Sequence, residues 1–165
     1  MNARLASMTL DHWPQVREIY LAGIAGGNAT FETEAPSWEQ WDAKHLPFGR
    51  IVAIVEDEVR GWAALSHVST RATYRGVAEN SVYVAPDVQG RGLGRLLLQA
   101  LVVESEANGI WTLQTSIFPE NVLSIRLHLS CGFREIGRRE RIAQLKGVWR
   151  STVFMERRST SVGAS

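Results

Sequence analysis

Cysteine is almost absent from this chain, since Cys131 is the only one in 165 residues. A single cysteine cannot form a disulfide within the chain, which excludes a disulfide-stabilised secreted scaffold and favours a reducing compartment. No stretch is apolar for the length that a transmembrane helix needs, and the first residues lack the apolar core of a signal peptide. We therefore expect a cytoplasmic protein.

An excess of charge of either sign is lacking as well. Lysine and arginine together number 18 and aspartate and glutamate 17, which leaves a net charge of +1. This balance favours neither nucleic acid nor an acidic membrane surface as a partner. The four histidines, at positions 12, 45, 67 and 128, lack the spacing of metal ligands. We expect no metal ion, and a small molecule as the main partner.

The most informative stretch runs from Asn80 to Gly109. Its β-branched run Val82–Val84 favours a strand, which Pro86 ends because proline has no N–H for a sheet ladder. The glycine-rich segment Gln89–Gly94 follows directly. Apolar residues at 93, 96, 97, 100 and 101 then predict a helix with one buried face, ended by Asn108-Gly109.

Caps, apolar alternation and turn residues predict the other elements. Strands are expected at 4–7, 51–56, 60–67, 111–117, 133–145 and 149–156, and helices from 9 or 11 to 26, from 37 to about 46, and over 120–130. Turns are expected at 57–58 and 146–147. Since there is no repeat or linker, we expect one α+β domain over residues 1–157 and a flexible tail over 158–165. Its mixed sheet would have about seven strands, flanked by about four helices.

The glycine-rich segment predicts an anion site, because a helix that begins in glycines presents unpaired N–H groups to a phosphate. It fits neither the Walker pattern nor the dinucleotide fingerprint. The spacing Gln89-x-x-Gly92-x-Gly94 instead resembles the pyrophosphate-binding motif of the GNAT superfamily, the acetyl-CoA-dependent N-acetyltransferases. A tight turn with incidental glycines is the alternative. The order of the expected elements is also similar to that of the GNAT fold along nearly the whole chain.

The resemblance implies acetyl-CoA as the cosubstrate and assigns residues to it. The implied cofactor-binding residues are Val82, Tyr83, Val84, Gln89, Gly90, Arg91, Gly92, Leu93, Gly94, Arg95, Asn121 and Ser130. His128 stands where the family usually has a tyrosine that serves as the thiolate's acid, so it is a candidate acid or an ordinary histidine. Cys131 reads as a core residue.

Three separated segments resemble one branch of the family, the phosphinothricin and methionine sulfone/sulfoximine acetyltransferases. They are Arg75-x-x-x-Glu79-x-Ser81-Val-Tyr-Val, Thr30-Phe-Glu-Thr-Glu34 and Gly147-Val-Trp-Arg150. The branch implies Glu79 as the catalytic base, with a strand-edge charge as the alternative. The implied substrate-binding residues are Phe31, Glu32, Thr33, Arg71, Tyr74, Arg75 and Trp149. The two arginines could hold a substrate carboxylate or could be ordinary surface residues.

The expected activity is transfer of the acetyl group from acetyl-CoA to the α-amine of a small amino acid analogue. Direct attack in a ternary complex is expected, because the sequence shows no nucleophile with an adjacent base. The family also implies a homodimer. Two alternatives remain open. One is a same-fold acetyltransferase for a peptide N-terminus, a polyamine or an antibiotic, and the other is a non-catalytic acyl-CoA-binding module.

Overall fold

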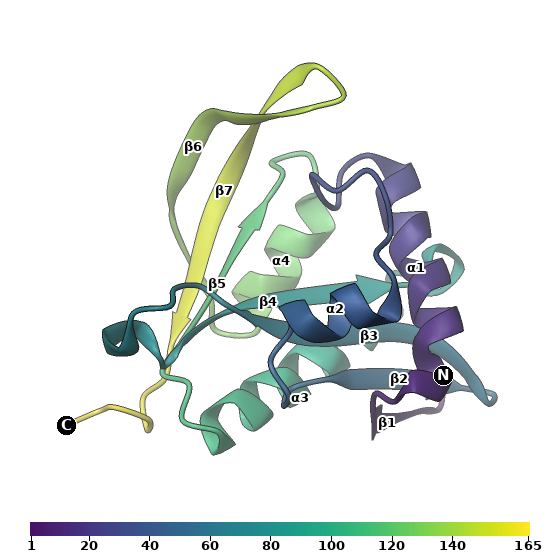
Figure 1. Cartoon of the computed structure of the whole chain (residues 1–165), viewed down its shortest axis with the longest axis horizontal. Coiled ribbons are helices and arrows are strands. Elements are labelled where there is room, and N and C mark those ends of the chain that lie inside the picture. The colour runs from purple at the N-terminus through teal and green to yellow at the C-terminus, as the bar shows by residue number, and fades with distance from the viewer.

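Seven strands form one mixed sheet in the order β1-β2-β3-β4-β5-β7-β6 (Figure 1). The computed structural model describes residues 1–165. The strands are β1 (Ala3–Ser7), β2 (Ile51–Val55), β3 (Glu58–His67), β4 (Val77–Val84), β5 (Thr112–Ile117), β6 (Arg134–Leu145) and β7 (Val148–Arg158). The helices are α1 (Trp13–Gly26), α2 (Trp38–Lys44), α3 (Leu93–Ala107) and α4 (Val122–Ser130), with 3-10 turns η1 (Leu10–His12), η2 (Ala72–Tyr74) and η3 (Pro86–Val88). The predicted α+β class is confirmed, and every predicted strand and helix is present.

The pairing of β4 with β5 positions the site. It is the one parallel pair in the sheet and joins only three residue pairs, from Val77–Thr112 to Glu79–Gln114. Beyond Glu79 the two strands no longer pair, while β4 stays paired with β3 as far as Val84. The edge of β4 that faces β5 is therefore unpaired from Asn80 onward.

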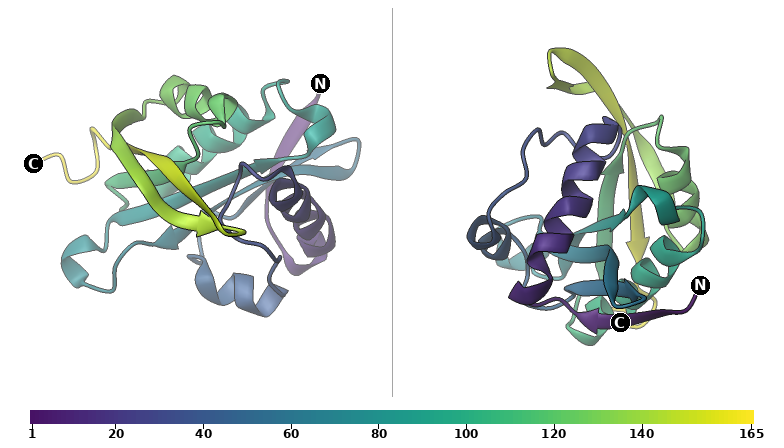
Figure 2. Two further views of the ribbon diagram at one scale, coloured as in Figure 1. Left: turned by 90° about the horizontal axis from the view of Figure 1, so that it is seen from above. Right: turned by 90° about the vertical axis from the view of Figure 1, so that its right-hand side faces the viewer.

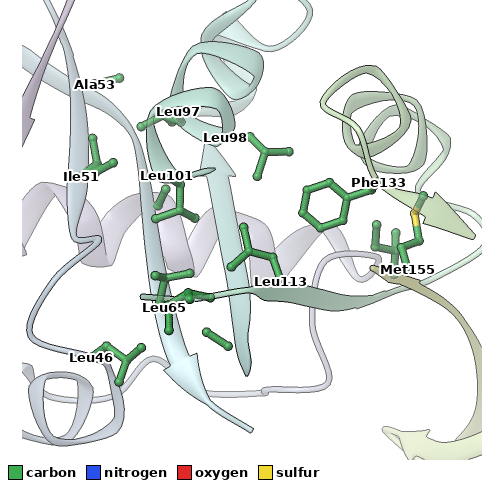
Figure 3. Packing of buried hydrophobic residues seen from close by; sticks show 14 of the residues in the cluster. Leu46, Ile51, Ala53, Leu65, Leu97, Leu98, Leu101, Leu113, Phe133 and Met155 are labelled. Carbon is green, nitrogen blue, oxygen red and sulfur yellow. The ribbon is translucent and has the colours of Figure 1, made fainter. Parts of the chain in front are cut away.

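Helices cover both faces of the sheet, α1 and α2 on one and α3 and α4 on the other (Figure 2). Under α3, Leu97, Leu98 and Leu101 are fully buried against residues of β2, β3 and β5 (Figure 3). Under α1 and α2, the core centres on Trp41 and Trp62, both fully buried. Each face of the sheet thus has its own apolar core.

Local signals place several boundaries where the sequence predicts them. Ser37 Oγ accepts from the Gln40 N–H at 3.2 Å and Gln40 Oε1 accepts from the Ser37 N–H at 3.0 Å, which confirms the capping box at the start of α2. The turn at Lys146-Gly147 is confirmed, with φ of 48° and 80°. The β2–β3 turn, however, falls at Glu56-Asp57, one residue before the predicted pair, with φ of 50° and 64°. A two-residue hairpin loop of type I′ needs positive φ at both positions, and an acidic pair adopts it here.

The predicted buried face of α3 needs a correction. Leu96 is 37% exposed although it was expected to be buried, and Leu98 is fully buried although it was not. Leu98 lies on the side of the helix toward Phe133 (Figure 3). The helix packs between the sheet and the residues that follow α4, so its buried stripe is rotated from the one that periodicity alone suggested.

The chain after α4 forms a long hairpin, in which β7 lies between β5 and β6 and the far end extends beyond the rest of the molecule (Figure 1). The segment after Arg158, expected to be a flexible tail, makes a compact set of hydrogen bonds. The Arg158 guanidinium donates to the carbonyl oxygens of Ser159 at 2.9 Å, Val162 at 2.8 Å and Gly163 at 2.7 Å. These bonds hold the segment against the end of the sheet.

Candidate active site

A cleft of about 660 Å³ opens where β4 and β5 separate. Its walls come from α1, the loop over residues 28–36, α2, the adjoining ends of β3, β4 and β5, and α4. Of the residues predicted for the site, it brings together Phe31, Glu32, Glu79, Val82, Tyr83, Asn121 and His128.

Glu79 lies at the point where the two strands part. Its side chain lines the cleft and is partly enclosed there, with some of its surface open to solvent. Partial burial raises the pKa of Glu79 above its usual value, and the positive charges of Lys44 and Arg139 oppose that shift. A carboxylate with a raised pKa is a stronger base, which suits the removal of a proton from an amine.

His45 belongs to the same wall, although sequence reasoning did not select it. Its backbone forms a β-bridge with Ser66, which pairs directly with Glu79, so the three residues form one row across the sheet. The Nδ1–H of His45 donates to the Trp41 carbonyl oxygen at 2.7 Å, and the ring stacks on the Trp41 indole at 4.0 Å. Burial lowers the pKa of His45 to about 4, so Nε2 is an unprotonated acceptor at neutral pH. No local pattern marks this residue, because the bridge to Ser66 brings it to the cleft.

Stacked aromatic rings form the wall opposite β5. The rings of Tyr20, Trp62 and Tyr83 are nearly parallel and contact one another, with centroids 5.2 Å apart for Tyr20 and Tyr83, 4.7 Å for Trp62 and Tyr83, and 5.7 Å for Tyr20 and Trp62. Gly23 of α1 makes this approach possible, because a Cβ at that position would lie 2.8 Å from the Tyr83 ring. Tyr83 therefore lines the cleft as part of a rigid apolar layer rather than as a mobile side chain.

The loop over residues 28–36 closes one side of the cleft. Phe31 packs edge-on against Phe118 at 4.8 Å, and Glu32 forms an ion pair with Lys44 at 3.8 Å. Arg150 and Asn121 both bind Asn28 at the start of the loop, at 2.8 Å and 3.2 Å. Arg150 belongs to a segment that the sequence singled out, yet its role as a brace appears only in the fold.

The glycine-rich segment begins α3 as predicted. Gly90 and Gly92 have φ of 75° and 89°, and a Cβ at either position would meet nothing within 4 Å. No side chain caps the first N–H groups of α3, which leaves them free to bind a ligand, and the exposed Arg91 and Arg95 add positive charge. Leu93 is 3% exposed, so only its backbone can take part. This arrangement fits a diphosphate.

Asn121 and Ser130 are engaged within the protein. Asn121 Oδ1 accepts from the Ser124 N–H at 3.3 Å and so caps α4, while Nδ2 donates to the carbonyl oxygen of Asn28. Ser130 Oγ donates to the Leu127 carbonyl oxygen at 2.7 Å, and Ser130 does not line the cleft.

His128 is 3% exposed, and burial lowers its pKa. Its Nδ1–H donates to the Ser124 carbonyl oxygen at 2.7 Å, and its Nε2 accepts from Asn80 Nδ2 at 3.0 Å. The proton of the neutral ring therefore points to a backbone carbonyl, and this geometry does not support the expected acid role.

Five other residues expected to bind substrate do not line this cleft: Thr33, Arg71, Tyr74, Arg75 and Trp149. Arg75 packs over the Trp111 ring at 5.6 Å and Arg71 over Tyr74 at 5.5 Å. The turn η2 precedes the start of β4 at Val77, whereas the cleft begins at Glu79. Trp149 is 50% exposed on the projecting hairpin. Lys44 is the one lysine or arginine that lines the cleft.

No three His, Cys, Asp or Glu side chains gather in the way that a metal site requires. None of the helices has both the length and the apolar character to cross a membrane.

Comparison with known proteins matches residues 13–133 to the acetyltransferase (GNAT) family. The chain is 32% identical over 155 residues to the phosphinothricin N-acetyltransferase of Alcaligenes faecalis, covering 89% of this chain and 78% of that protein. It is 29% identical over 163 residues to the L-methionine sulfoximine/L-methionine sulfone acetyltransferase of Pseudomonas paraeruginosa, covering 94% of each. A crystal structure of a phosphinothricin acetyltransferase from Sinorhizobium meliloti in complex with acetyl-CoA superposes with a TM-score of 0.89 at 29% identity, covering 100% of this chain and 92% of that one.

Proposed function

The chain belongs to the GNAT family of acetyl-CoA-dependent N-acetyltransferases, and on that premise we propose that it acetylates the α-amine of a small amino acid analogue. Phosphinothricin, methionine sulfoximine and methionine sulfone are the leading substrates, because the names of the similar acetyltransferases contain these compounds. The observation that carries the proposal is the position of Glu79, inside the cleft at the parting of β4 and β5.

Glu79 is the proposed base. Its carboxylate would take the proton from the substrate ammonium, directly or through a water molecule, before the amine attacks the thioester. Burial raises the pKa of Glu79 and brings the base closer to the pKa of an α-ammonium, about 8 in model compounds. The neutral Nε2 of His45 and the hydroxyl of Ser66, in the same row, offer two further acceptors for a group with three N–H bonds.

The cosubstrate supplies an activated acetyl thioester, and the chain's part is to bind and orient it. The open N-terminus of α3 would hold its diphosphate, with Arg91 and Arg95 alongside. The unpaired edge of β4 from Asn80 onward would bind its extended arm by main-chain hydrogen bonds. No hydroxyl in the cleft is hydrogen-bonded to a base that could activate it. The proton on His128 Nδ1 points to the Ser124 carbonyl oxygen, and the Ser66 hydroxyl bonds neither Glu79 nor His45. Direct attack in a ternary complex follows, and an acetylated enzyme trapped without amine would contradict it.

Lys44 is the proposed partner of a substrate carboxylate, since it is the one lysine or arginine in the cleft. Lys44→Met should raise the Michaelis constant for carboxylate-bearing amines and have a smaller effect on simple amines. Arg75→Ala is the matched comparison, because the branch resemblance assigns the same role to Arg75. If Arg75→Ala raises this Michaelis constant more than Lys44→Met does, the carboxylate binds at the loop before β4 instead.

A second candidate substrate class has a specific observation in its favour. Three carboxylates, Glu32, Glu34 and Glu79, line the cleft against one lysine. An acidic cleft attracts cations, so a polyamine is the runner-up acceptor.

We also propose a homodimer, supported by the projecting hairpin of β6 and β7. Its exposed side chains include Ile136, Ile142, Val148 and Trp149, a set of large apolar groups that a second copy could cover. Light scattering on the purified protein tests this, with Val148→Asp expected to favour the monomer. A monomer of the unaltered protein at micromolar concentration would end the proposal.

The decisive experiment measures release of free CoA from acetyl-CoA across a panel of amines. The panel contains phosphinothricin, methionine sulfoximine, methionine sulfone, ordinary amino acids, spermidine and a peptide. Release with the first three supports the proposed substrate class. Release with spermidine alone would replace it with the polyamine, and release with the peptide alone would replace it with a peptide N-terminus.

A further inference from the structure

Asn80 has a buried acceptor without a partner. It is the first residue of β4 beyond the last pairing with β5, and it is 3% exposed. Its Nδ2 donates to His128 Nε2 at 3.0 Å, whereas its Oδ1 is buried and has no hydrogen-bond partner. Buried polar atoms are nearly always paired, because an unpaired one loses its bond to water without replacement. An unpaired acceptor on a residue that lines a binding cleft therefore points to a donor on a ligand.

His128 determines which way the Asn80 carboxamide faces. The Ser124 carbonyl oxygen, 2.7 Å from His128 Nδ1, can only accept, so Nδ1 carries the proton and Nε2 is left as an acceptor. Nε2 can then bind the NH₂ of Asn80 but not its oxygen. Because the nitrogen and oxygen of a carboxamide diverge, Oδ1 must point away from His128. Burial lowers the pKa of His128, which keeps the ring in this neutral form.

The position of Asn80 limits the kind of donor that can reach it. Asn80 and His128 both line the cleft, and Asn80 begins the unpaired edge of β4. Side chains alternate along a strand, so Asn80 and its neighbour Glu79 point to opposite faces of the sheet. The amine that Glu79 deprotonates therefore lies on the other face. The pantetheine arm of acetyl-CoA carries two amide N–H groups and suits an unpaired strand edge.

We propose that Asn80 Oδ1 accepts a hydrogen bond from an amide N–H of the pantetheine arm, and that His128 is the positioning residue that orients the carboxamide for it. This assignment gives His128 a role other than that of an acid. It rests on the use of acetyl-CoA and does not depend on which amine is acetylated.

Binding of two unreactive ligands tests the role of Asn80. CoA contains the pantetheine arm, whereas adenosine 3′,5′-bisphosphate lacks the arm and one phosphate of the diphosphate and keeps the adenosine with its 3′- and 5′-phosphates. Calorimetry on Asn80→Leu should show a dissociation constant for CoA about five- to tenfold higher than that of the unaltered protein, the size of one net hydrogen bond. The constant for adenosine 3′,5′-bisphosphate should not change. An unchanged constant for CoA, or equal weakening of both ligands, would overturn the proposal.

Two variants test the positioning role of His128. His128→Leu removes the acceptor for Asn80 Nδ2 and should weaken CoA binding as Asn80→Leu does. His128→Gln can return an oxygen acceptor near the position of Nε2 and should restore most of the affinity. A general-acid role predicts the reverse, with normal CoA affinity in both His128 variants and a lower rate only in turnover.

A ligand-side experiment uses the unaltered protein and so does not depend on the folding of any variant. Two CoA analogues each replace one pantetheine amide N–H with an ester oxygen. One of them should bind about fivefold more weakly than CoA to the unaltered protein, and that difference should disappear in Asn80→Leu when the variant folds. If both analogues bind the unaltered protein as tightly as CoA, Asn80 accepts no hydrogen bond from the arm.

Discussion

Arg150 on β7 donates from Nη2 to Oδ1 of Asn28 at 2.8 Å, across 122 positions of sequence. Its Nη1 donates to the Gly27 carbonyl oxygen at 3.0 Å, and its guanidinium lies 4.0 Å from the centre of the Phe118 ring. These contacts fix the start of the loop that carries Phe31 into the cleft. The brace thus links the last strand to the wall of the active site.

Arg150→Lys should loosen that wall. Lysine cannot reproduce the planar fork that reaches Gly27 and Asn28 together, so we expect a loss of about 1–3 kcal/mol in the free energy of unfolding. The Michaelis constant for the amine should rise more than that for acetyl-CoA. Urea denaturation and steady-state kinetics measure the two effects. Arg138→Lys, at an exposed position of β6, is the matched control and should change neither.

Glu79→Gln should lower the activity and raise the stability of the protein at pH 7. Because Glu79 is the proposed base, its loss should lower the rate of CoA release by about 10²- to 10⁴-fold. Burial raises the pKa of Glu79, so the folded state holds this proton more tightly than the unfolded state. The proton's stabilising effect is present below the unfolded pKa and is lost as pH rises through the folded pKa.

The glutamine of Glu79→Gln cannot ionise, so this variant should melt at a higher temperature than the unaltered protein at pH 7. That advantage should vanish below the ordinary pKa of 4.5, where the wild-type carboxyl is protonated in both states. Melting curves across pH measure it, with Glu135→Gln on exposed β6 as the control. If Glu79→Gln releases CoA as fast as the unaltered protein, Glu79 is not the base. If it is less stable at pH 7, burial of the ionised carboxylate does not destabilise the fold.

His45 should make the fold sensitive to acid. Burial lowers its pKa from 6.5 to about 4, so the folded state favours the neutral ring. Its contribution is fully present above pH 6.5 and is lost as pH falls toward 4, by roughly 3 kcal/mol in total.

His45→Phe keeps a ring that can stack on Trp41 and cannot take up a proton. The unfolding free energy of this variant should decline less steeply than that of the unaltered protein between pH 6.5 and 4. Chemical denaturation at several pH values gives the slope, and His67→Phe at an exposed position should leave it as it was. Identical slopes in His45→Phe and the unaltered protein would show that another group carries the acid sensitivity.

Gly23 and Gly26, both on α1, allow a comparison of the same substitution at a crowded and at an open position. A Cβ at position 23 would lie 2.8 Å from the Tyr83 ring, which packs against both Tyr20 and Trp62 and cannot yield freely. Gly23→Ala should therefore cost about 1–3 kcal/mol of stability and disturb the cleft wall. Gly26 has nothing within 4 Å of its Cβ position, so Gly26→Ala should gain about 0.5–1 kcal/mol. Thermal unfolding of both variants checks the contrast, and equal effects would show that the ring stack is not the cause.

Much of the fold follows from the sequence because its signals act over a few residues. The capping box of Ser37 and Gln40 and the turn at Lys146-Gly147 need only local hydrogen bonds and local backbone angles. The glycine motif likewise identified the start of α3 and, by resemblance, the family. Glu79 could be selected because it lies at the start of the central strand, in a segment that resembles one branch of the family.

Tertiary structure alone decided the rest of the site. The branch resemblance suggested Arg75 as the carboxylate partner, but Arg75 packs over Trp111, and Lys44 is the one lysine or arginine that lines the cleft. The sequence offers His128 as an acid or an ordinary histidine, whereas in the fold its two ring nitrogens bind Ser124 and Asn80. The sequence determined the elements and the family, since these depend on neighbouring residues. The cleft depends on contacts such as that of Arg150 with Asn28, which exist only after the sheet and helices have packed.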